Sequence, residues 1–213
     1  KKIQDFYTEK YGVVHPTKAG LKIPEIFDAA INKEVKALWI IGEDVVQTDP
    51  NSAHVVKAMN ALDLLVVQEI FLSETAKHAD VVLPGTTFLE KDGTFTNTER
   101  RVQRVNKAAE PLPGTKPDGV IVTEMMQKLG YNQPMYDADE VLAEIADVVP
   151  FFKGITRERL GKLGLQWPVK EDGTDTKILH EKEFKLGKGR IKYFDWKESS
   201  EIKNNHKDFP LIL

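Results

Sequence analysis

The stretch Lys36-Ala37-Leu38-Trp39-Ile40-Ile41-Gly42 is continuously apolar after its first residue and ends at a glycine. Uninterrupted apolar runs are typical of strands that are buried on both faces of a parallel sheet, since half-exposed strands alternate apolar and polar residues. Two further runs of this kind lie at 63–68 and 80–84. The pattern therefore predicts three parallel strands, the first of which ends at Gly42.

Segments with helical spacing lie between these strands. Apolar residues recur on one helix face at 23–32 and at 52–61, and a short helix capped by Ser73 is expected at 73–76. Alternating strands and helices predict the α/β fold class, with a doubly wound, Rossmann-like and mostly parallel sheet flanked by helices. Ligands of such sheets bind at the carboxyl ends of the strands.

The part of the chain after the third strand is less regular. Lys91-Asp92-Gly93 indicates a turn, and we expect 94–104 to be irregular and polar. Asp118 is placed to cap a helix that Gly130 ends, and another helix is expected at 137–148.

Regular patterns weaken beyond Pro150. Short apolar patches predict an extended tail with one helix and one hairpin, and 208–213 is typical of a strand that begins a further domain. The basic, aromatic segment 182–197 indicates either a solvated hairpin whose rings pack inward or a surface for single-stranded nucleic acid, and its acidic residues favour the hairpin. We predict an α/β domain over 1–150 and a tail or linker over 151–213.

The composition argues against several classes of function. Thirty basic and 33 acidic residues give a net charge of −3, which provides no global field for nucleic acid or an anionic membrane. No segment has the apolar length of a membrane span. Cysteine is absent, which excludes disulfides, thiolate metal sites, iron–sulfur ligation and a cysteine nucleophile within this chain. We therefore expect a cytoplasmic protein that binds neither nucleic acid nor membrane.

Common catalytic and nucleotide motifs are also missing. The glycine-rich motifs of standard NAD and P-loop sites do not occur, and the five histidines show no metal-ligand spacing. We expect no catalytic residue and no metal ligand in this chain. Its first residue is not an initiator Met, which favours a fragment cut from a longer protein, although tag removal gives the same start.

Polar residues follow the first two predicted strands. Gly42 and Asp44 come after the first, and Gln68 and Glu69 come after the second. Carboxylates at this edge can accept hydrogen bonds from ribose hydroxyls or from the N1–H and N2–H groups of guanine. Thr48 and the backbone amides that follow it can bind a phosphate. The same acids can equally be helix caps and solvated loop residues, since a fold alone does not fix a function.

Three segments resemble a known family. Residues 38–49 and 66–84 are similar to formate dehydrogenase alpha subunits, and Glu90-Lys91-Asp92-Gly93-Thr94-Phe95-Thr96-Asn97-Thr98-Glu99-Arg100-Arg101-Val102-Gln103 resembles a signature of molybdopterin oxidoreductases. The segments follow the family's order and spacing over about 21–130. Residues 150–168 also resemble formate dehydrogenases rather than nitrate reductases.

The resemblance implies that this chain is the second of two α/β domains that each clasp one molybdopterin guanine dinucleotide. The cofactor is then a bis-molybdopterin guanine dinucleotide with molybdenum or tungsten. Carried over by position, the cofactor-binding residues are Gly42, Asp44, Thr48, Gln68, Glu69, Gly85, Thr86, Lys91 and Asp118. The residues Asn97, Glu99 and Arg100 either position the cofactor or only hold their loop.

Two of these positions depart from the family's usual pattern. Many relatives have Asp where this chain has Glu69, and Asn where it has Asp44. Glu places its carboxylate one methylene further out, and Asp only accepts where Asn also donates. Both residues still suit a guanosine.

The resemblance also implies the activity of the whole protein. Formate is oxidised to carbon dioxide, and two electrons leave through a 4Fe-4S cluster whose cysteines lie upstream, as does the metal ligand. This piece alone is expected to be inactive, and its partners are the remaining domains of the same subunit and an electron-transfer subunit or acceptor linked to NAD or ferredoxin. The alternatives are the equivalent domain of another molybdopterin enzyme, such as an assimilatory nitrate reductase, and a cofactor-less scaffold domain of a respiratory-complex-type subunit.

Overall fold

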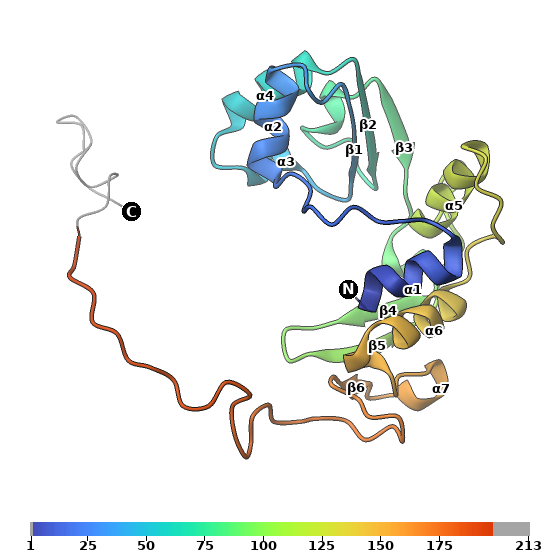
Figure 1. Cartoon of the computed structure of the whole chain (residues 1–213). Coiled ribbons are helices and arrows are strands. Elements are labelled where there is room, and N and C mark those ends of the chain that lie inside the picture. The colour runs from blue at the N-terminus through green and yellow to red at the C-terminus, as the bar shows by residue number, and fades with distance from the viewer. Residues whose placement is uncertain (1, 198–213) are drawn as a thin grey trace. The chain divides into compact units, whose positions relative to one another are not determined.

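A computed structural model describes residues 2–197 (Figure 1). The chain divides into a larger unit that ends at Lys177 and a second unit that begins at Ile178. The boundary at 150 between an α/β domain and a tail stays a prediction.

The larger unit contains the predicted parallel sheet. Strands β1 (Ala37–Ile41), β2 (Leu64–Glu69) and β3 (Val81–Pro84) lie in the order β1-β2-β3. Both pairings are parallel, with Trp39 opposite Val66 and Val66 opposite Val81. The α/β fold class with helices around a parallel sheet is confirmed.

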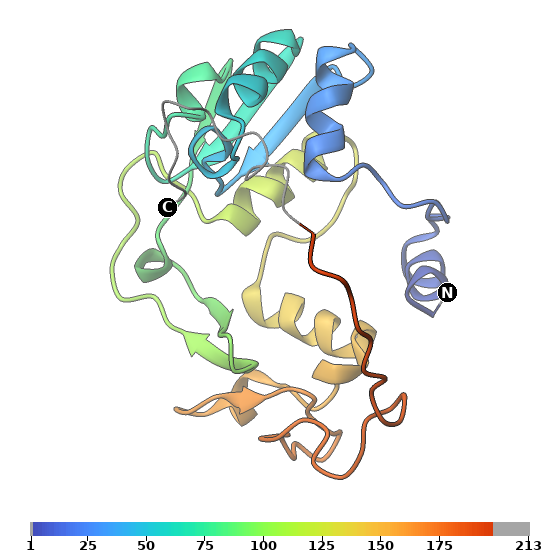
Figure 2. The ribbon, with the colours of Figure 1, turned by 90° about the vertical axis from the view of Figure 1, so that its left-hand side faces the viewer.

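Helices α2 (Ile23–Ile31) and α4 (Ser52–Ala61) cover one face of this sheet (Figures 1 and 2). Pro24 stands in the first turn of α2, where its missing N–H costs no hydrogen bond. The side chain of Asn51 caps α4 by accepting from the His54 amide at 3.3 Å. Both predicted helices are confirmed. Their apolar faces and the strands share one buried core, made of Phe27, Ala30, Ile40, Val45, Val55, Ala58, Met59, Leu65, Val67 and Ala76.

Two short elements complete this part of the unit. Helix α3 (Val45–Thr48) follows β1, and the 3₁₀ turn η1 (Ala76–His78) stands where a short helix was expected. Ser73 Oγ accepts from the Ala76 amide at 3.2 Å. The 3₁₀ turn itself begins at Ala76 with Thr75 as its cap residue, so the helix expected at 73–76 with Ser73 as its cap does not form as predicted.

A second sheet follows the first, and the expectation that 94–104 is irregular is wrong. Strands β4 (Gly93–Thr96) and β5 (Arg101–Val105) form an antiparallel hairpin, and the short β6 (Leu165–Gln166) pairs with β5. Only Val102 is fully buried in β5, at 0% exposure. The hairpin therefore lacks the apolar run by which a buried strand is recognised in a sequence. Its sequence pattern is that of a polar loop.

The second sheet has its own core, to which α6 (Ala138–Val148), the 3₁₀ turn η3 (Pro150–Phe152) and α7 (Arg157–Leu160) contribute. Asp137 caps α6 by accepting from two amides, as a helix at 137–148 requires. The core consists of Val102, Leu142, Ile155, Leu160 and Val169, with Phe152, Leu165 and Trp167 packed against it.

Two helices differ from expectation. In α5 (Asp118–Lys128) the residue Asp118 is the first helical position and makes no capping hydrogen bond to the helix, so the predicted cap is wrong. Its carboxylate bonds to other elements instead. Helix α1 (Lys2–Tyr11) was not expected, because its apolar residues are few and interleaved with charges.

The second unit has neither helix nor strand between 178 and 197. Its large apolar side chains are exposed, with Leu186 at 99%, Ile191 at 102% and Tyr193 at 88%. The hairpin with inward-packed aromatics that the sequence predicts does not form in these residues. The strand predicted at 208–213 lies outside the described residues.

Candidate functional site

The three parallel strands end at one edge of the sheet and bring three loops together there. The Gly42 amide donates to the Gln68 carbonyl oxygen at 2.9 Å, and the Gly85 amide donates to the Glu69 carbonyl oxygen at 3.0 Å. The parallel ladder thus continues to the first residue of each loop. The residues expected at this edge do converge, whereas their roles toward a ligand stay predictions.

Gln68 is the buried centre of this edge, at 0% exposure. Its amide nitrogen donates to Asp118 Oδ1 at 2.8 Å, and the Lys91 ammonium forms an ion pair with Asp118 Oδ2. Lys91 also donates to the Thr86 carbonyl oxygen at 3.1 Å. Four of the predicted site residues, Gln68, Thr86, Lys91 and Asp118, therefore form one hydrogen-bonded group.

The carboxylate of Asp118 is ionised in this group. Burial on its own raises the pKa of Asp118, but hydrogen bonds from Lys91 and Gln68 and the positive charge of Lys91 outweigh it and hold the pKa below the ordinary value of 3.8. The Asp118 carboxylate can accept hydrogen bonds from N–H or O–H groups of a ligand. The neighbouring Lys91 ammonium can donate hydrogen bonds to the oxygens of the same ligand.

Two buried polar atoms at this edge have no partner among residues 2–197. They are Gln68 Oε1 and Thr86 Oγ1, and Thr86 is 1% exposed. Leaving such a group unpaired costs about 1–3 kcal/mol, so these atoms are suited to contact a polar ligand or an ordered water.

Asp44 is engaged within the protein. Its Oδ1 accepts from the Thr75 amide at 2.9 Å and from the Thr75 hydroxyl at 2.6 Å. Its Oδ2 accepts from Gln47 Nε2 at 2.5 Å and from the Glu74 amide at 3.3 Å. A carboxylate has about four lone-pair positions, and all are used here, so a ligand has to displace one donor to reach Asp44.

Those donors also fix the charge of Asp44. Burial raises the pKa of the Asp44 carboxyl, and the hydrogen bonds from Thr75, Gln47 and Glu74 together lower it below the ordinary 3.8. The ionised carboxylate ties the loop after β1 to the turn before η1.

The remaining candidate residues in the loops after β1 and β2 make fewer hydrogen bonds within the protein than Asp44 does. Among residues 2–197, Glu69 Oε1 accepts a hydrogen bond only from the neighbouring Ile70 amide, at 2.7 Å. The Thr48 hydroxyl donates to Glu43 at 2.5 Å. Gly42 has a φ of +62°, a left-handed conformation that explains a glycine at this position.

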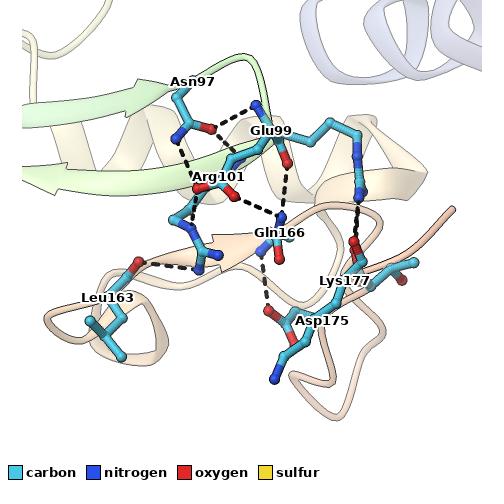
Figure 3. A network of polar contacts seen from close by, with 9 residues as sticks. Asn97, Glu99, Arg101, Leu163, Gln166, Asp175 and Lys177 are labelled. Carbon is cyan, nitrogen blue, oxygen red and sulfur yellow. Dashed lines mark hydrogen bonds and ion pairs between the residues drawn. The ribbon is translucent and has the colours of Figure 1, made fainter.

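A second polar network surrounds the hairpin turn (Figure 3). Asn97 and Arg101 both bond to Glu99 Oε1, at 3.1 and 2.8 Å. Gln166 of β6 donates to the Glu99 carbonyl oxygen at 3.0 Å. Side-chain hydrogen bonds from Arg101, first, and from Asn97 lower the pKa of Glu99 below its usual value. The partner of Glu99 is thus Arg101 rather than Arg100.

Arg100 contacts a different segment of the chain, at 167–177. Its guanidinium donates to the carbonyl oxygens of Trp167, Thr176 and Lys177, the last two at 3.1 Å, and lies 5.8 Å from the Trp167 ring centre. Of the two roles considered for this motif, these contacts support the one in which it holds the chain, because Glu99 and Arg100 bond to the turn and to the segment 166–177.

Some residues around these groups carry no signal in the sequence. Thr75 is fully buried and bonds to Asp44 from 31 positions away, and Tyr136 and Phe88 share a pocket with Lys91 and Asp118. Such neighbours come from distant segments, so only the three-dimensional structure identifies them.

The described residues contain no group of three or more His, Asp or Glu side chains placed to hold a metal ion. None of the helices in this part of the chain has the length and apolar content that a membrane span needs.

Comparison with known proteins gives a consistent result. The family model for molybdopterin oxidoreductase matches residues 12–128. The chain is 46% identical over 200 residues to the F420-dependent formate dehydrogenase subunit alpha of Methanocaldococcus jannaschii, which is 92% of this chain and 29% of that protein. It is 40% identical over 212 residues to the F420-dependent formate dehydrogenase 1 subunit alpha of Methanococcus maripaludis, which is 97% of this chain and 31% of the relative.

A solved structure supports the fold. Acetylene hydratase from Pelobacter acetylenicus superposes with a TM-score of 0.55 at 23% identity, over 74% of this chain and 22% of the other. The chain spans less than a third of the length of all three proteins.

Proposed function

Since the chain belongs to the molybdopterin oxidoreductase family, we propose that it is part of a formate dehydrogenase catalytic subunit and holds one guanosine end of a bis-molybdopterin guanine dinucleotide. The observation that carries the proposal is the group formed by Gln68, Thr86, Lys91 and Asp118 at the strand ends. Two of its buried atoms can still accept or donate a hydrogen bond.

The residues divide into contact and support roles. Gln68, Lys91 and Asp118 present an amide, an ammonium and a carboxylate to the nucleotide, and Glu69 offers its second oxygen to ribose hydroxyls. Asp44 holds the loop through Thr75, and the φ of Gly42 sets the loop's course beside the cofactor. When bound, the cofactor supplies the molybdenum or tungsten centre at which formate gives up two electrons and a proton.

The larger enzyme supplies what this chain lacks. We propose that the metal ligand, the 4Fe-4S cluster and the second nucleotide-binding domain belong to the remaining domains of the same subunit, and that the piece alone is inactive. An electron-transfer subunit or acceptor is the proposed partner. F420 joins NAD and ferredoxin as an acceptor to test, because both relatives above are F420-dependent by name. A cytoplasmic location fits these partners.

Formate is favoured over nitrate as substrate because the relatives are formate dehydrogenase alpha subunits. The test is made on the whole subunit that contains this chain. Acid treatment of the purified subunit is expected to release GMP, and formate is expected to reduce an added electron acceptor. Release of CMP or AMP in place of GMP, or activity with nitrate and none with formate, contradicts the proposal.

Gln68→Leu in the whole subunit gives the test at the level of the site. The substitution removes the amide that holds Asp118, so less GMP per subunit is expected. Gln103→Leu, on the exposed side of β5, is the matched control and is expected to keep the full content. Equal GMP contents in both variants argue against a nucleotide site at Gln68.

A further inference from the structure

A second pocket, of about 340 Å³, lies where helix α1 meets α5, the loop that follows it, and helix α6. None of its lining residues belongs to the group formed by Gln68, Thr86, Lys91 and Asp118. Its walls are largely aromatic and contain one carboxylate, and the residues that decide its chemistry are Tyr7, Tyr11, His15, Met126, Tyr131 and Glu144. The pocket is therefore a separate candidate site.

The aromatic rings of this pocket come from three segments and meet at different angles. Tyr7 and Tyr11 lie one turn apart on α1, and their rings stack with centres 5.5 Å apart. The Tyr131 ring meets the Tyr11 ring edge to face at 6.5 Å, and the His15 ring meets the Tyr7 ring at 5.1 Å. Because the faces of aromatic rings are electron-rich, rings grouped around a pocket attract a cation.

Glu144 of α6 adds a negative charge beside these rings. The Tyr11 hydroxyl donates to Glu144 Oε1, and this hydrogen bond raises the pKa of Tyr11 above its ordinary 10.0, so Tyr11 stays protonated and neutral. Lys10 Nζ lies 3.5 Å from Glu144 Oε2. Each oxygen of the carboxylate thus already has a partner within the protein.

Lys10 shows that an ammonium group is attracted to this cluster. Its Nζ atom lies 5.3 Å from the ring centre of Phe6 and 5.5 Å from that of Tyr11. Lys10 does not line the pocket, and among residues 2–197 no Lys or Arg is placed over the rings of Tyr7 and Tyr131. Aromatic surface inside the pocket therefore remains for a cation from outside the chain.

We propose that this pocket binds the trimethylammonium head of a small organic cation, with the rings of Tyr7, Tyr11 and Tyr131 around the head and Glu144 as its counter-charge. The site is distinct from the nucleotide site and adds a second ligand to the proposed function. A volume of about 340 Å³ is at the lower end of the range of about 300–1,000 Å³ that small-molecule sites occupy, which suits a compact ligand.

Hydrogen bonding decides which kind of cation fits. A primary ammonium has three N–H donors and a guanidinium has five, and a donor that loses water without gaining an acceptor costs about 1–3 kcal/mol. A trimethylammonium group has no N–H. It therefore needs only the ring faces and the charge of a carboxylate whose oxygens are already bonded.

The test is an NMR titration of the folded, isotope-labelled full chain with choline, ethanolamine and dimethylbutanol at constant ionic strength. Choline is expected to shift the signals of Tyr7, Tyr11 and Tyr131. Dimethylbutanol has the shape of choline without its charge, and ethanolamine has the charge with three N–H donors. Each is expected to bind at least about threefold more weakly than choline.

Two pairs of variants separate the rings from the charge. Tyr131 is 38% exposed, so it can be replaced without disturbing a core. Tyr131→Leu removes an aromatic face and is expected to weaken choline at least about threefold, whereas Tyr131→Phe keeps the face and most of the affinity. Glu144→Gln removes the counter-charge and is expected to weaken choline by a similar factor. Glu140→Gln, at an exposed position of α6, is the matched control and is expected to keep the affinity.

A peptide with one trimethyllysine distinguishes the two sources of this head group. We expect it to bind no more tightly than choline, and tighter binding of the peptide overturns the assignment to a small ligand. Equal affinity for choline and dimethylbutanol, equal affinity in Tyr131→Leu and Tyr131→Phe, or no shift at high millimolar choline in a folded sample overturns the site itself. None of these results changes the GMP content of the whole subunit, so the proposed function keeps its own test.

Discussion

Gln68 Nε2 donates to Asp118 Oδ1 over 2.8 Å and so joins the end of β2 to the first residue of α5, fifty positions later in the chain. Gln68 is completely buried. The Asp118 carboxylate that it contacts also forms an ion pair with the Lys91 ammonium. Because one carboxylate receives two partners from different segments, it connects the parallel sheet, the turn before β4 and helix α5.

Replacing Gln68 tests the contribution of this bond to stability. Gln68→Leu keeps a similar side-chain volume but leaves the Asp118 carboxylate with one partner fewer, so the free energy of unfolding is expected to fall by about 1–3 kcal/mol. Urea unfolding followed by circular dichroism measures it. Gln103→Leu is the control and is expected to change stability by no more than about 0.5 kcal/mol. Equal losses in the two variants contradict a special role for Gln68.

Asp44 provides a second stability test. Asp44→Ala removes four hydrogen bonds and leaves the hydroxyl of the fully buried Thr75 without its acceptor. We expect a loss of about 2–3 kcal/mol in urea unfolding. The exposed Asp63 pairs with Lys33 at 3.8 Å, so Asp63→Ala is expected to cost less than about 1 kcal/mol. If Asp44→Ala is as stable as Asp63→Ala, the loop does not depend on this carboxylate.

The lowered pKa of Asp118 implies that the stability of the chain depends on pH in a definite direction. Its pKa is lowered in the folded chain, so the unfolded chain binds more protons near pH 4 and stability from this group is lost as pH falls through the folded pKa. Asp118→Asn does not titrate, and its urea midpoint is expected to fall less between pH 6 and pH 3 than that of the unsubstituted chain. Asp147→Asn, the control, should keep the original slope. A steeper fall in Asp118→Asn contradicts the assignment.

Most of the first sheet could be predicted from the sequence because burial repeats along it in simple patterns. The apolar runs that became β1, β2 and β3 and the helical spacing of α2 and α4 fixed their places to within one or two residues. Convergence of Gly42, Gln68 and Gly85 then followed from parallel topology alone.

The second sheet and the partners within the site could not be predicted in this way. Val102 is the one fully buried residue in β5, so this strand has no periodic signal, and its pairing with β6 joins segments about 60 positions apart. Asp118 has the sequence context of a helix cap, but its carboxylate bonds to Lys91 and Gln68. A partly buried ion pair between distant elements leaves no signal in local sequence patterns.

Arg100 offers a test of the network around the hairpin. Arg100→Lys keeps the charge and the backbone but loses the planar fork that reaches three carbonyl oxygens, so residues 166–177 are expected to exchange amide hydrogens at least about fivefold faster. Arg104→Lys removes one 3.3 Å contact to Asn106 and is the control. Unchanged exchange in Arg100→Lys contradicts the role of Arg100 in holding this segment.

Gly154 gives the most demanding test of the second core. A Cβ added there would lie 1.6 Å from the Lys170 carbonyl oxygen, and a backbone atom cannot move away as a flexible side chain can. Gly154→Ala must therefore push the residues after η3 away from the backbone at Lys170 and at Val169, whose carbonyl oxygen accepts from the Gly154 amide, and the expected loss is about 3 kcal/mol in urea unfolding. Gly93→Ala is the matched control, since a Cβ there meets nothing within 4 Å, and its stability is expected to stay within about 1 kcal/mol of the original. Because Gly154 and Lys170 belong to the segment that follows Pro150, a large loss in Gly154→Ala alone means that this segment is folded as part of the larger unit, whereas equal stabilities mean that it separates from the core at little cost.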